Sequence, residues 1–233
     1  MSATQDHAPG VPTAAVLDYD AGNLRSAEKS LQRAGFDAFV TSGASRADGA
    51  DLVVVPGVGH FGQCVRQFDA AGFAPLIRHR VAARLPVLGI CVGLQIMYEG
   101  SDEDPDVPGF GVLPGWVHRF GDRTDGDRTA DERTLRVPHM GWNVIRPVGP
   151  GADPLLVGVA GQRGYFVHSY YAAPSDPSHV IADTWHGITF PAIARDGAVV
   201  GTQFHPEKSG DVGRRLLQNL CAEVAAVTAV NAS

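Results

Sequence analysis

One stretch of the sequence, residues 85–100, limits the possible folds more than any other. An apolar run leads to Cys91, which stands between Gly89 and Gly93, and apolar residues up to Tyr98 then recur at helical spacing. This pattern predicts a strand that turns abruptly into a helix, because only residues without a Cβ allow such close packing around a strained turn. In hydrolases a turn of this kind carries a nucleophile, which here is the thiol of Cys91.

A position at the start of a helix should favour the thiolate of Cys91. Unpaired N–H groups and the helix dipole stabilise an anion there, and the N–H of Val92 is a candidate donor to an oxyanion. Most lone cysteines are buried core residues, so the pattern alone leaves a structural role for Cys91 open.

The composition favours a globular protein with a small substrate. Of 233 residues, 44% are hydrophobic and 19% charged, which is typical of a globular protein. The net charge of −6 does not favour binding to nucleic acid or to an anionic membrane. No apolar run approaches the ~18 residues of a membrane span, and the N-terminus lacks a signal-peptide pattern. Three widely separated cysteines fit free thiols in a reducing compartment, so we expect a cytoplasmic protein.

The order of strand and helix patterns predicts the fold class. Strands and helices alternate up to residue 100, as in a parallel sheet covered on both faces, and short strand-like runs follow. We expect an α/β fold with a mostly parallel central sheet, helices on both faces and antiparallel additions in the second half. Residues 1–12 should form a disordered leader, 13–229 a single domain and 230–233 a tail, with a solvated charged loop at 121–133.

Individual elements follow from the same patterns. Helices are expected at 24–34, closed by Gly35, at 61–84 with a break near Gly72, and at 211–227. Strands are expected to end at Cys91 and to occupy 13–17, 36–41, 51–55, 112–120, 134–137, 144–147, 165–171, 180–184, 192–195 and 199–204.

Three glycines, Gly57, Gly59 and Gly62, form a GxGxxG pattern after a strand, as in dinucleotide-binding folds. Those folds also need an acidic residue about 20 positions later, at the end of the next strand, where this chain has Cys91. The glycines therefore fit better as flexible backbone whose N–H groups can be aimed at a developing oxyanion.

His205 and Glu207 are the predicted partners of the thiol. Residues i and i+2 of an extended segment point to the same side, so the imidazole and the carboxylate can face one cleft, with Glu207 fixing the tautomer of His205. A surface histidine beside an acid is the alternative. A zinc site made from Cys91, His205 and Glu207 would lack a fourth protein ligand, so no metal is expected.

The remaining histidines and cysteines of interest are predicted to be structural. His139 and His168 lie in aromatic strand-like stretches without a carboxylate at short spacing. Cys64 and Cys221 lie in apolar helical patterns and are expected in the core.

Six motifs give the chain a resemblance to a known family. GICVGLQ (89–95) and FHPEKS (204–209) are similar to motifs of the triad glutamine amidotransferases. Four further motifs resemble those of one group within that family, the glutaminase subunits of imidazole glycerol phosphate synthases. These motifs are DYDAGN (18–23), PGVGHF (56–61), PHMGWN (138–143) and YFVHSYY (165–171). The resemblance spans most of the chain, from residue 13 to about 224.

This resemblance implies hydrolysis of L-glutamine without a cofactor. Cys91 would attack the carboxamide and His205 would protonate the leaving ammonia, with oxyanion donors at Val92 and, after a peptide flip, at Val58. The positions that match substrate-binding residues of the family are Gly57, Gly59, Gln95, Glu103, Ser169 and Tyr170.

The resemblance also implies a heterodimer with a (β/α)₈-barrel cyclase subunit. That subunit uses the ammonia to make imidazole glycerol phosphate and aminoimidazole carboxamide ribonucleotide in histidine biosynthesis. Asn23, Trp142, Tyr165 and Lys208 match positions that face it. A cation one residue past Glu207 suits an ion pair across the interface, and a solvated lysine is the alternative.

Three other functions remain to be distinguished. A glutaminase subunit for anthranilate or pyridoxal phosphate synthesis is disfavoured by PHMGWN and by Lys208. A catalytically silent binding subunit is disfavoured by the intact Cys91, His205 and Glu207. A cysteine peptidase-like hydrolase would not need Gln95 and Glu103. The charged loop at 121–133 and the leader are additions to the family pattern.

Overall fold

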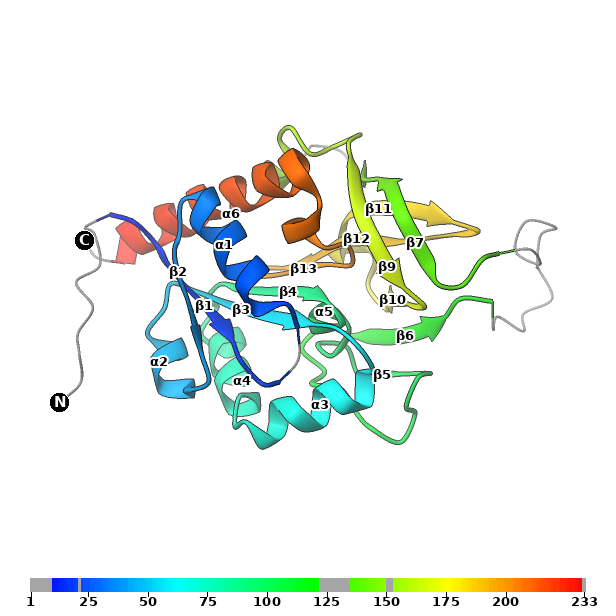
Figure 1. Cartoon of the computed structure of the whole chain (residues 1–233), viewed down its shortest axis with the longest axis horizontal. Helices are drawn as coiled ribbons and strands as arrows, with labels where there is room; N and C mark the ends of the chain where they lie inside the picture. Colours follow the sequence, from blue (N-terminus) through cyan, green and yellow to red (C-terminus); the bar gives the residue numbers. More distant parts are fainter. Residues whose placement is uncertain (1–9, 21, 122–134, 150–152, 232–233) are drawn as a thin grey trace.

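The computed structural model describes residues 10–20, 22–121, 135–149 and 153–231, so most of the predicted leader and charged loop lies outside them. An eight-stranded sheet forms the centre of the molecule (Figure 1). Its strands, in spatial order, are β2 (Asp37–Thr41), β1 (Thr13–Leu17), β3 (Leu52–Gly57), β4 (Val87–Cys91), β13 (Val199–Thr202), β12 (Ile188–Asp196), β11 (Val180–His186) and β8 (Arg146–Pro147).

The direction of the strands confirms the predicted fold class. All neighbours from β2 to β13 are parallel, whereas β12, β11 and β8 are added antiparallel. Every residue of β1, β3 and β4 is buried, which is why their sequences are continuous apolar runs without alternation. The carboxyl ends of β3 and β4 lie side by side, with Gly57 opposite Cys91.

Helices cover both faces of the sheet, as predicted (Figure 1). On one face α1 (Leu24–Ala34) packs beside α6 (Gly210–Asn231), and the other carries α2 (Ala44–Asp48), α3 (Phe61–Ala70) and α4 (Ala74–Ala82). Gly35 ends α1 in a left-handed conformation, φ 113°, as expected for a glycine there. The final helix runs to Asn231, four residues beyond its predicted end at 227.

Two smaller sheets stand beside the main one and account for most errors of the strand prediction. One consists of β10 (Tyr170–Pro174), β6 (Gly115–Arg119) and β5 (Gly100–Ser101), and the other pairs β7 (His139–Val144) with β9 (Arg163–His168). The strand predicted at 165–171 is broken at Ser169, because the chain leaves β9 there to pair with β6 as β10. The PHMGWN segment forms β7, which was not predicted, and residues 135–137 form no strand.

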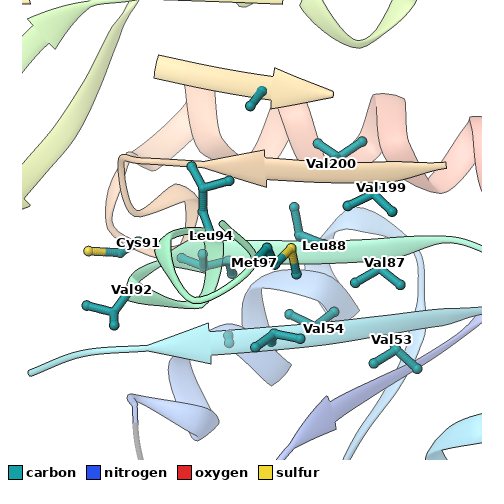
Figure 2. Close-up of a cluster of buried hydrophobic side chains, with 14 of the residues drawn as sticks. Val53, Val54, Val87, Leu88, Cys91, Val92, Leu94, Met97, Val199 and Val200 are labelled. Atoms are coloured by element: carbon teal, nitrogen blue, oxygen red, sulfur yellow. The ribbon is translucent and has the colours of Figure 1, made fainter. Parts of the chain in front are cut away.

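A cluster of branched apolar side chains holds β3, β4 and β13 together (Figure 2). Full burial of one such side chain contributes roughly 1.5–3 kcal/mol to folding. The cluster includes Val53, Leu88 and Val200, and Leu94 packs over its end. The thiol of Cys91 points away from the cluster in Figure 2. The core thus fixes the end of β4 and leaves the sulfur facing outward from it.

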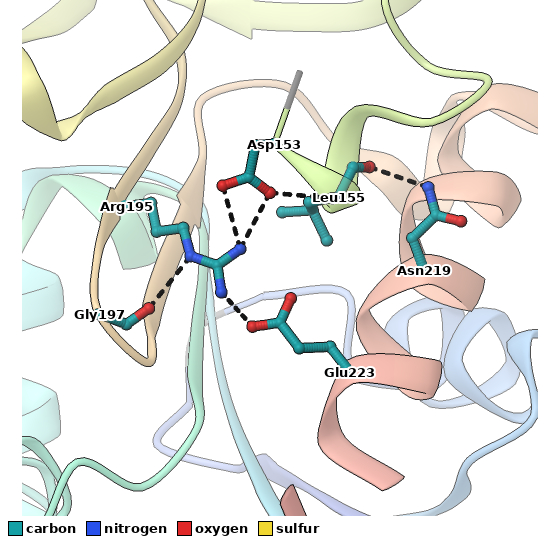
Figure 3. Close-up of polar contacts among 6 residues, drawn as sticks. All are labelled: Asp153, Leu155, Arg195, Gly197, Asn219 and Glu223. Atoms are coloured by element: carbon teal, nitrogen blue, oxygen red, sulfur yellow. Dashed lines mark hydrogen bonds and ion pairs between the residues drawn. The ribbon is translucent and has the colours of Figure 1, made fainter. Parts of the chain in front are cut away.

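Arg195 ties the antiparallel part of the sheet to the last helix (Figure 3). Its Nη1 contacts both carboxylate oxygens of Asp153, at 3.0 and 3.2 Å, its Nη2 pairs with Glu223 of α6, and its Nε donates to the carbonyl of Gly197. These contacts therefore anchor the turn that leads into β13, the strand that carries the chain towards His205.

Candidate active site

The predicted turn between strand and helix is present at Cys91. β4 ends at this residue, which has φ 54° and ψ −110°, a strained conformation for a residue with a side chain. A Cβ on Gly93 would lie 1.9 Å from the carbonyl oxygen of Val55, and one on Gly89 would lie 2.8 Å from the carbonyl of Gly93. Both glycines are therefore required for the close packing, as the sequence predicted.

The helix after Cys91 is shorter than the sequence pattern indicates. α5 (Val92–Gln95) has a single turn, and Met97 and Tyr98 instead donate to carbonyls three residues back. The next residue, Glu99, already pairs with Gly115 at the start of β6. One turn gives little macrodipole, so any stabilisation of a thiolate here comes from nearby donors rather than from a long helix.

His205 reaches Cys91 from the segment that follows β13. Its N–H donates to the carbonyl of Tyr165, and its own carbonyl accepts from the hydroxyl of Ser209, which fixes the backbone. Nδ1 of the imidazole lies 2.8 Å from Oε1 of Glu207, so Nε2 is the nitrogen left to hydrogen-bond Cys91. The structure thus brings the three side chains together.

The sequence argument for Glu207 was right about the contact and wrong about the backbone. Residues Pro206–Lys208 form the 3₁₀ turn η4 rather than an extended segment. Proline favours the first position of a helical turn, and the turn folds Glu207 back beneath the imidazole. Alternation along an extended chain therefore does not explain the pair.

The environment of His205 stabilises its protonated form. Burial alone would lower its pKa, but the hydrogen bonds that the ring donates to Cys91 and Glu207, together with the negative charges of these two groups, outweigh burial and raise the pKa to about 9. The arrangement can therefore hold His205 as an imidazolium at neutral pH, with Cys91 on one side of the ring and Glu207 on the other.

A cavity of about 440 Å³ opens in front of the sulfur at the carboxyl ends of the parallel strands, where ligands of such sheets bind. Most of the predicted site residues line it. The complete lining is Val58, Gly59, Cys91, Val92, Gln95, Glu103, Pro138, Val167, His168, Ser169, Tyr170, His205 and Lys208. Gly57 does not line this cavity, because it lies one residue further back within β3.

Gln95 and Glu103 each keep one oxygen available towards this cavity. Nε2 of Gln95 is held by the carbonyl of Tyr170, at 2.9 Å, and by Oε1 of Gln203, at 3.1 Å. Oε2 of Glu103 accepts the N–H of Phe61 at 2.7 Å. Gln95 is thus fixed through its NH₂ group and Glu103 through Oε2, so each has one remaining oxygen, Oε1, that it can present to a cationic group.

The segment after β3, where an oxyanion donor was predicted at Val58, is open to solvent. Val58 is 41% exposed, and Gly59 has φ 94° with open space where a Cβ would lie. The carbonyl of Val58 accepts a hydrogen bond from the thiol of Cys64, 3.3 Å away, which holds the peptide between Val58 and Gly59.

Cys64 itself remains a thiol. Burial, and then the charges of Cys91 and Glu103, raise its pKa to about 11. Cys64 is a core residue, as predicted.

The residues predicted to face a partner lie near the mouth of the cavity or on the adjoining β7–β9 sheet. Trp142 is 52% exposed and packs edge-to-face on Tyr165, its partner in the β-ladder. Asn23 is exposed before α1, and Lys208 is exposed at the cavity. Among the residues that the structure describes, Lys208 has no ion pair.

His139 and His168 form a buried pair, as a structural role predicts. Nδ1 of His139 lies 3.0 Å from Nε2 of His168, whose Nδ1 lies 2.7 Å from the carbonyl of Tyr170. Burial, with smaller effects from neighbouring histidines, lowers the pKa of His139 to about 4 and that of His168 to about 3. His168 nonetheless lines the cavity, which the sequence did not suggest.

Gln203 was missed by the sequence analysis. Its side chain is completely buried and its amide nitrogen lies 3.8 Å from the sulfur of Cys91. It stands two residues before His205, in the bend that follows β13, and the sequence of this segment gives no sign that its amide reaches the sulfur.

A larger groove, of about 720 Å³, lies between the β6–β10 sheet and the β11–β12 hairpin, with Asp102 and His118 at its edge. It contains none of the residues predicted to carry chemistry. In the described part of the chain, no three His, Cys, Asp or Glu side chains gather as they would around a metal ion. Nor does any described helix have the length and apolar character needed to cross a membrane.

Comparison with known proteins identifies the family. The profile of the class-I glutamine amidotransferases matches residues 16–224. The chain belongs to this family. Solved structures agree with this amidotransferase fold: a crystal structure of a glutamine amidotransferase covers 92% of the chain with a TM-score of 0.68 at 22% identity, and PurLQS from Thermotoga maritima covers 92% with a TM-score of 0.67 at 20% identity. Each match covers 99% of the solved chain.

Several relatives of this amidotransferase carry a more specific name, imidazole glycerol phosphate synthase subunit HisH. The protein of that name from Synechococcus sp. strain JA-3-3Ab is 46% identical over 214 residues, which cover 91% of this chain and 94% of the relative. Those from Deinococcus radiodurans and Thermus thermophilus are 42% and 43% identical, and cover 92% and 88% of the chain and 95% and 93% of the relatives.

Proposed function

We propose that this amidotransferase is the glutaminase subunit of an imidazole glycerol phosphate synthase. It hydrolyses L-glutamine to glutamate and ammonia and supplies the ammonia to a (β/α)₈-barrel cyclase subunit in histidine biosynthesis. The single observation that carries the chemistry is the contact of Cys91 with His205, which Glu207 in turn binds at 2.8 Å. The HisH relatives, at more than two fifths identity over most of the chain, support the choice of pathway.

In the proposed mechanism the thiolate of Cys91 attacks the carboxamide carbon of glutamine. The C–N bond then breaks as His205 gives its proton from Nε2 to the leaving ammonia, and a glutamyl thioester forms. His205 next removes a proton from water, which attacks the thioester and releases glutamate and the thiolate. Glu207 keeps Nδ1 protonated throughout, since it is a buried acceptor on that side.

Charge on the carboxamide oxygen is stabilised by backbone N–H groups. That of Val92 starts α5 and has no acceptor within the helix. The N–H of Val58 becomes the second donor after the peptide between Gly57 and Val58 rotates, a motion that the open conformation of Gly59 allows. We infer that partner binding drives this rotation, so the isolated subunit is slow.

The α-amino and α-carboxylate groups of glutamine bind at the other end of the cavity. The free oxygens of Gln95 and Glu103 accept hydrogen bonds from the ammonium group. Ser169 and Tyr170, at the break between β9 and β10, line this end of the cavity, and their backbone meets the carboxylate.

The cyclase docks over the mouth of the cavity, on a surface marked by Asn23, Trp142, Tyr165 and Lys208. Large exposed aromatic and aliphatic side chains support this position: Met140 is 64% and Trp142 52% exposed on β7. A protected route for ammonia is chemically required, because in neutral water it would become ammonium and lose its nucleophilicity. The free thiols of the chain suit a cytoplasmic complex.

The test is the glutaminase rate of the chain alone, with a barrel cyclase, and with the cyclase and its nucleotide ligand. We expect slow hydrolysis alone and a large increase in the complex. Full activity without any partner would contradict the proposed activation, and co-purification with an anthranilate or pyridoxal phosphate synthase would identify a different pathway.

A further inference from the structure

Gln203 places a buried amide directly against the sulfur of the proposed nucleophile. Its side chain has no solvent exposure, and its Nε2 lies 3.8 Å from Sγ of Cys91, within hydrogen-bonding distance for sulfur. Gln203 is held at its backbone as well, where its N–H donates to the carbonyl of Ala192 in β12. Burial of the side chain and this backbone hydrogen bond therefore hold the amide in place beside the sulfur.

The hydrogen bonds around the amide decide which of its ends faces the sulfur. The carbonyl of Tyr170 can only accept, so the end of Gln95 that faces it is the NH₂ group. That same NH₂ group donates a hydrogen bond to Gln203, so the acceptor must be the amide oxygen of Gln203, at 3.1 Å. The NH₂ group of Gln203 is thus the end that faces Cys91.

A donor in this position distinguishes between the two states of the cysteine. A buried N–H without an acceptor is costly, and a hydrogen bond to a charged acceptor is stronger than one to a neutral group. The thiol is a weak acceptor and the thiolate a strong one, so the contact favours the thiolate. One-turn α5 offers little dipole, which leaves His205 and Gln203 as the side chains that stabilise the anion.

We propose that Gln203 is a further catalytic residue, whose amide donates a hydrogen bond to the sulfur of Cys91 and stabilises the thiolate before attack and after thioester hydrolysis. The proposal rests on the nucleophilic role of Cys91. Because Gln95 binds both Gln203 and, as proposed above, the substrate, the same chain of contacts aligns the sulfur with the bound glutamine.

The reactivity of Cys91 towards iodoacetamide tests this role without any substrate or partner. The alkylation rate at Cys91 is followed by mass spectrometry across pH in the full chain and in Gln203→Met, which keeps the length of the side chain and removes the donor. The pH midpoint of alkylation is expected to rise by about one unit, since loss of a hydrogen bond to a charged group changes an equilibrium about tenfold. An unchanged midpoint in folded Gln203→Met would overturn the proposal.

Thr202→Val is the matched control. Thr202 precedes Gln203, is equally buried, and its hydroxyl has no hydrogen-bond partner among the described residues, so Val fits its place. Its midpoint should equal that of the unchanged chain, and a rise equal to that in Gln203→Met would show a structural effect and overturn the proposal.

A second variant keeps the test decisive if Gln203→Met does not fold. Gln203→Glu keeps the shape of the side chain and puts a carboxylate where the donor was, so it should raise the midpoint by more than one unit; no rise would again overturn the proposal. The complex gives a separate readout of the function itself. If the complex with Cys91→Ala still hydrolysed glutamine, the proposed function would be wrong. If turnover depends on Cys91 but the alkylation midpoint of Gln203→Met is unchanged, only the role proposed for Gln203 is wrong.

Discussion

Nδ1 of His205 lies 2.8 Å from Oε1 of Glu207, and both side chains are almost closed to solvent, at 3% and 5% exposed. A carboxylate buried so close to an imidazole fixes its tautomer and stabilises its protonated form. Together with the hydrogen bond to Cys91, this contact raises the pKa of His205 to about 9, although burial opposes its charge. The pair therefore sets both the direction and the pH range of proton transfer to ammonia.

Replacing Glu207 with Gln should separate these effects. The amide has the size of the carboxylate and lacks its charge, so the pKa of His205 should fall from about 9. Turnover in the complex should drop by roughly 10²–10⁴-fold, by analogy with the loss of the acid in a Ser-His-Asp triad, and its alkaline limb should move to lower pH. A pH profile of kcat measures both, and a wild-type alkaline limb in the variant would remove Glu207 from this role.

Replacing Cys91 with Ala should abolish glutamine-dependent synthesis by the complex and leave ammonia-dependent synthesis intact. The thioester cannot form without the sulfur, while ammonia added to the solution bypasses this subunit. The two rates are measured on the same preparation with glutamine or an ammonium salt as the nitrogen source.

Cys221→Ala is the control for that comparison. This cysteine lies on α6 against Gly35, away from the cavity, and should leave both rates unchanged. Glutamine-dependent turnover in Cys91→Ala would show that another group is the nucleophile.

The parts of the site that the sequence predicted are those set by local sterics. The two glycines around Cys91 are demanded by contacts within a few residues of the turn, and such contacts can be deduced from spacing alone. The parallel direction of the strands in the first half follows similarly from the alternation of strand and helix patterns. Most of the fold could therefore be predicted from interactions between residues that are close together in the sequence.

Features that depend on distant partners were missed. Arg80 is completely buried, because its guanidinium donates to carbonyls of Asp48, Ala50, Asp51 and Pro86, and nothing in its helix indicates those acceptors. In β7 the apolar side chains of Met140 and Trp142 are the exposed ones and the polar His139 is buried, so the formation of this strand depends on pairing with β9. The role of the Gln203 amide likewise could not be predicted, because it depends on contacts with Gln95 and Cys91, which are distant in the sequence.

Loss of the Arg195 contacts should destabilise the fold without changing the site. Arg195→Met keeps the aliphatic stem and leaves Asp153 and Glu223, which are largely buried, without their cation. The expected loss is about 2 kcal/mol, since removing one member of a mostly buried ion pair leaves the other uncompensated. Urea unfolding measures it, with Arg66→Met as the control because its pair with Asp104 is 60% exposed on the arginine side.

Replacement of Lys208 with Ala should weaken assembly with the cyclase or uncouple glutamine hydrolysis from synthesis. Lys208 is exposed at the mouth of the cavity, where a cation suits a carboxylate of the partner. Binding is measured by titration at two salt concentrations, and coupling by the ratio of glutamate to product. Lys29→Ala, on the exposed part of α1, tests whether any surface lysine has this effect. An unchanged complex with an unchanged ratio would exclude Lys208 from the interface.

Acid should destabilise the fold through the buried pair His139 and His168. Their pKa values in the folded state, about 4 and 3, lie below the ~6.5 of an unfolded chain, so the unfolded state binds protons first as the pH falls. The contribution of the neutral pair is fully present above pH ~6.5 and is lost on acidification towards pH 4, by up to about 2 kcal/mol per histidine at pH 5. Urea unfolding between pH 7.5 and 5 should therefore show a steep loss that His139→Gln reduces. The exposed His79 has no such environment, so His79→Gln should keep the full loss, and an equal slope in all three chains would show that the buried pair does not control acid stability.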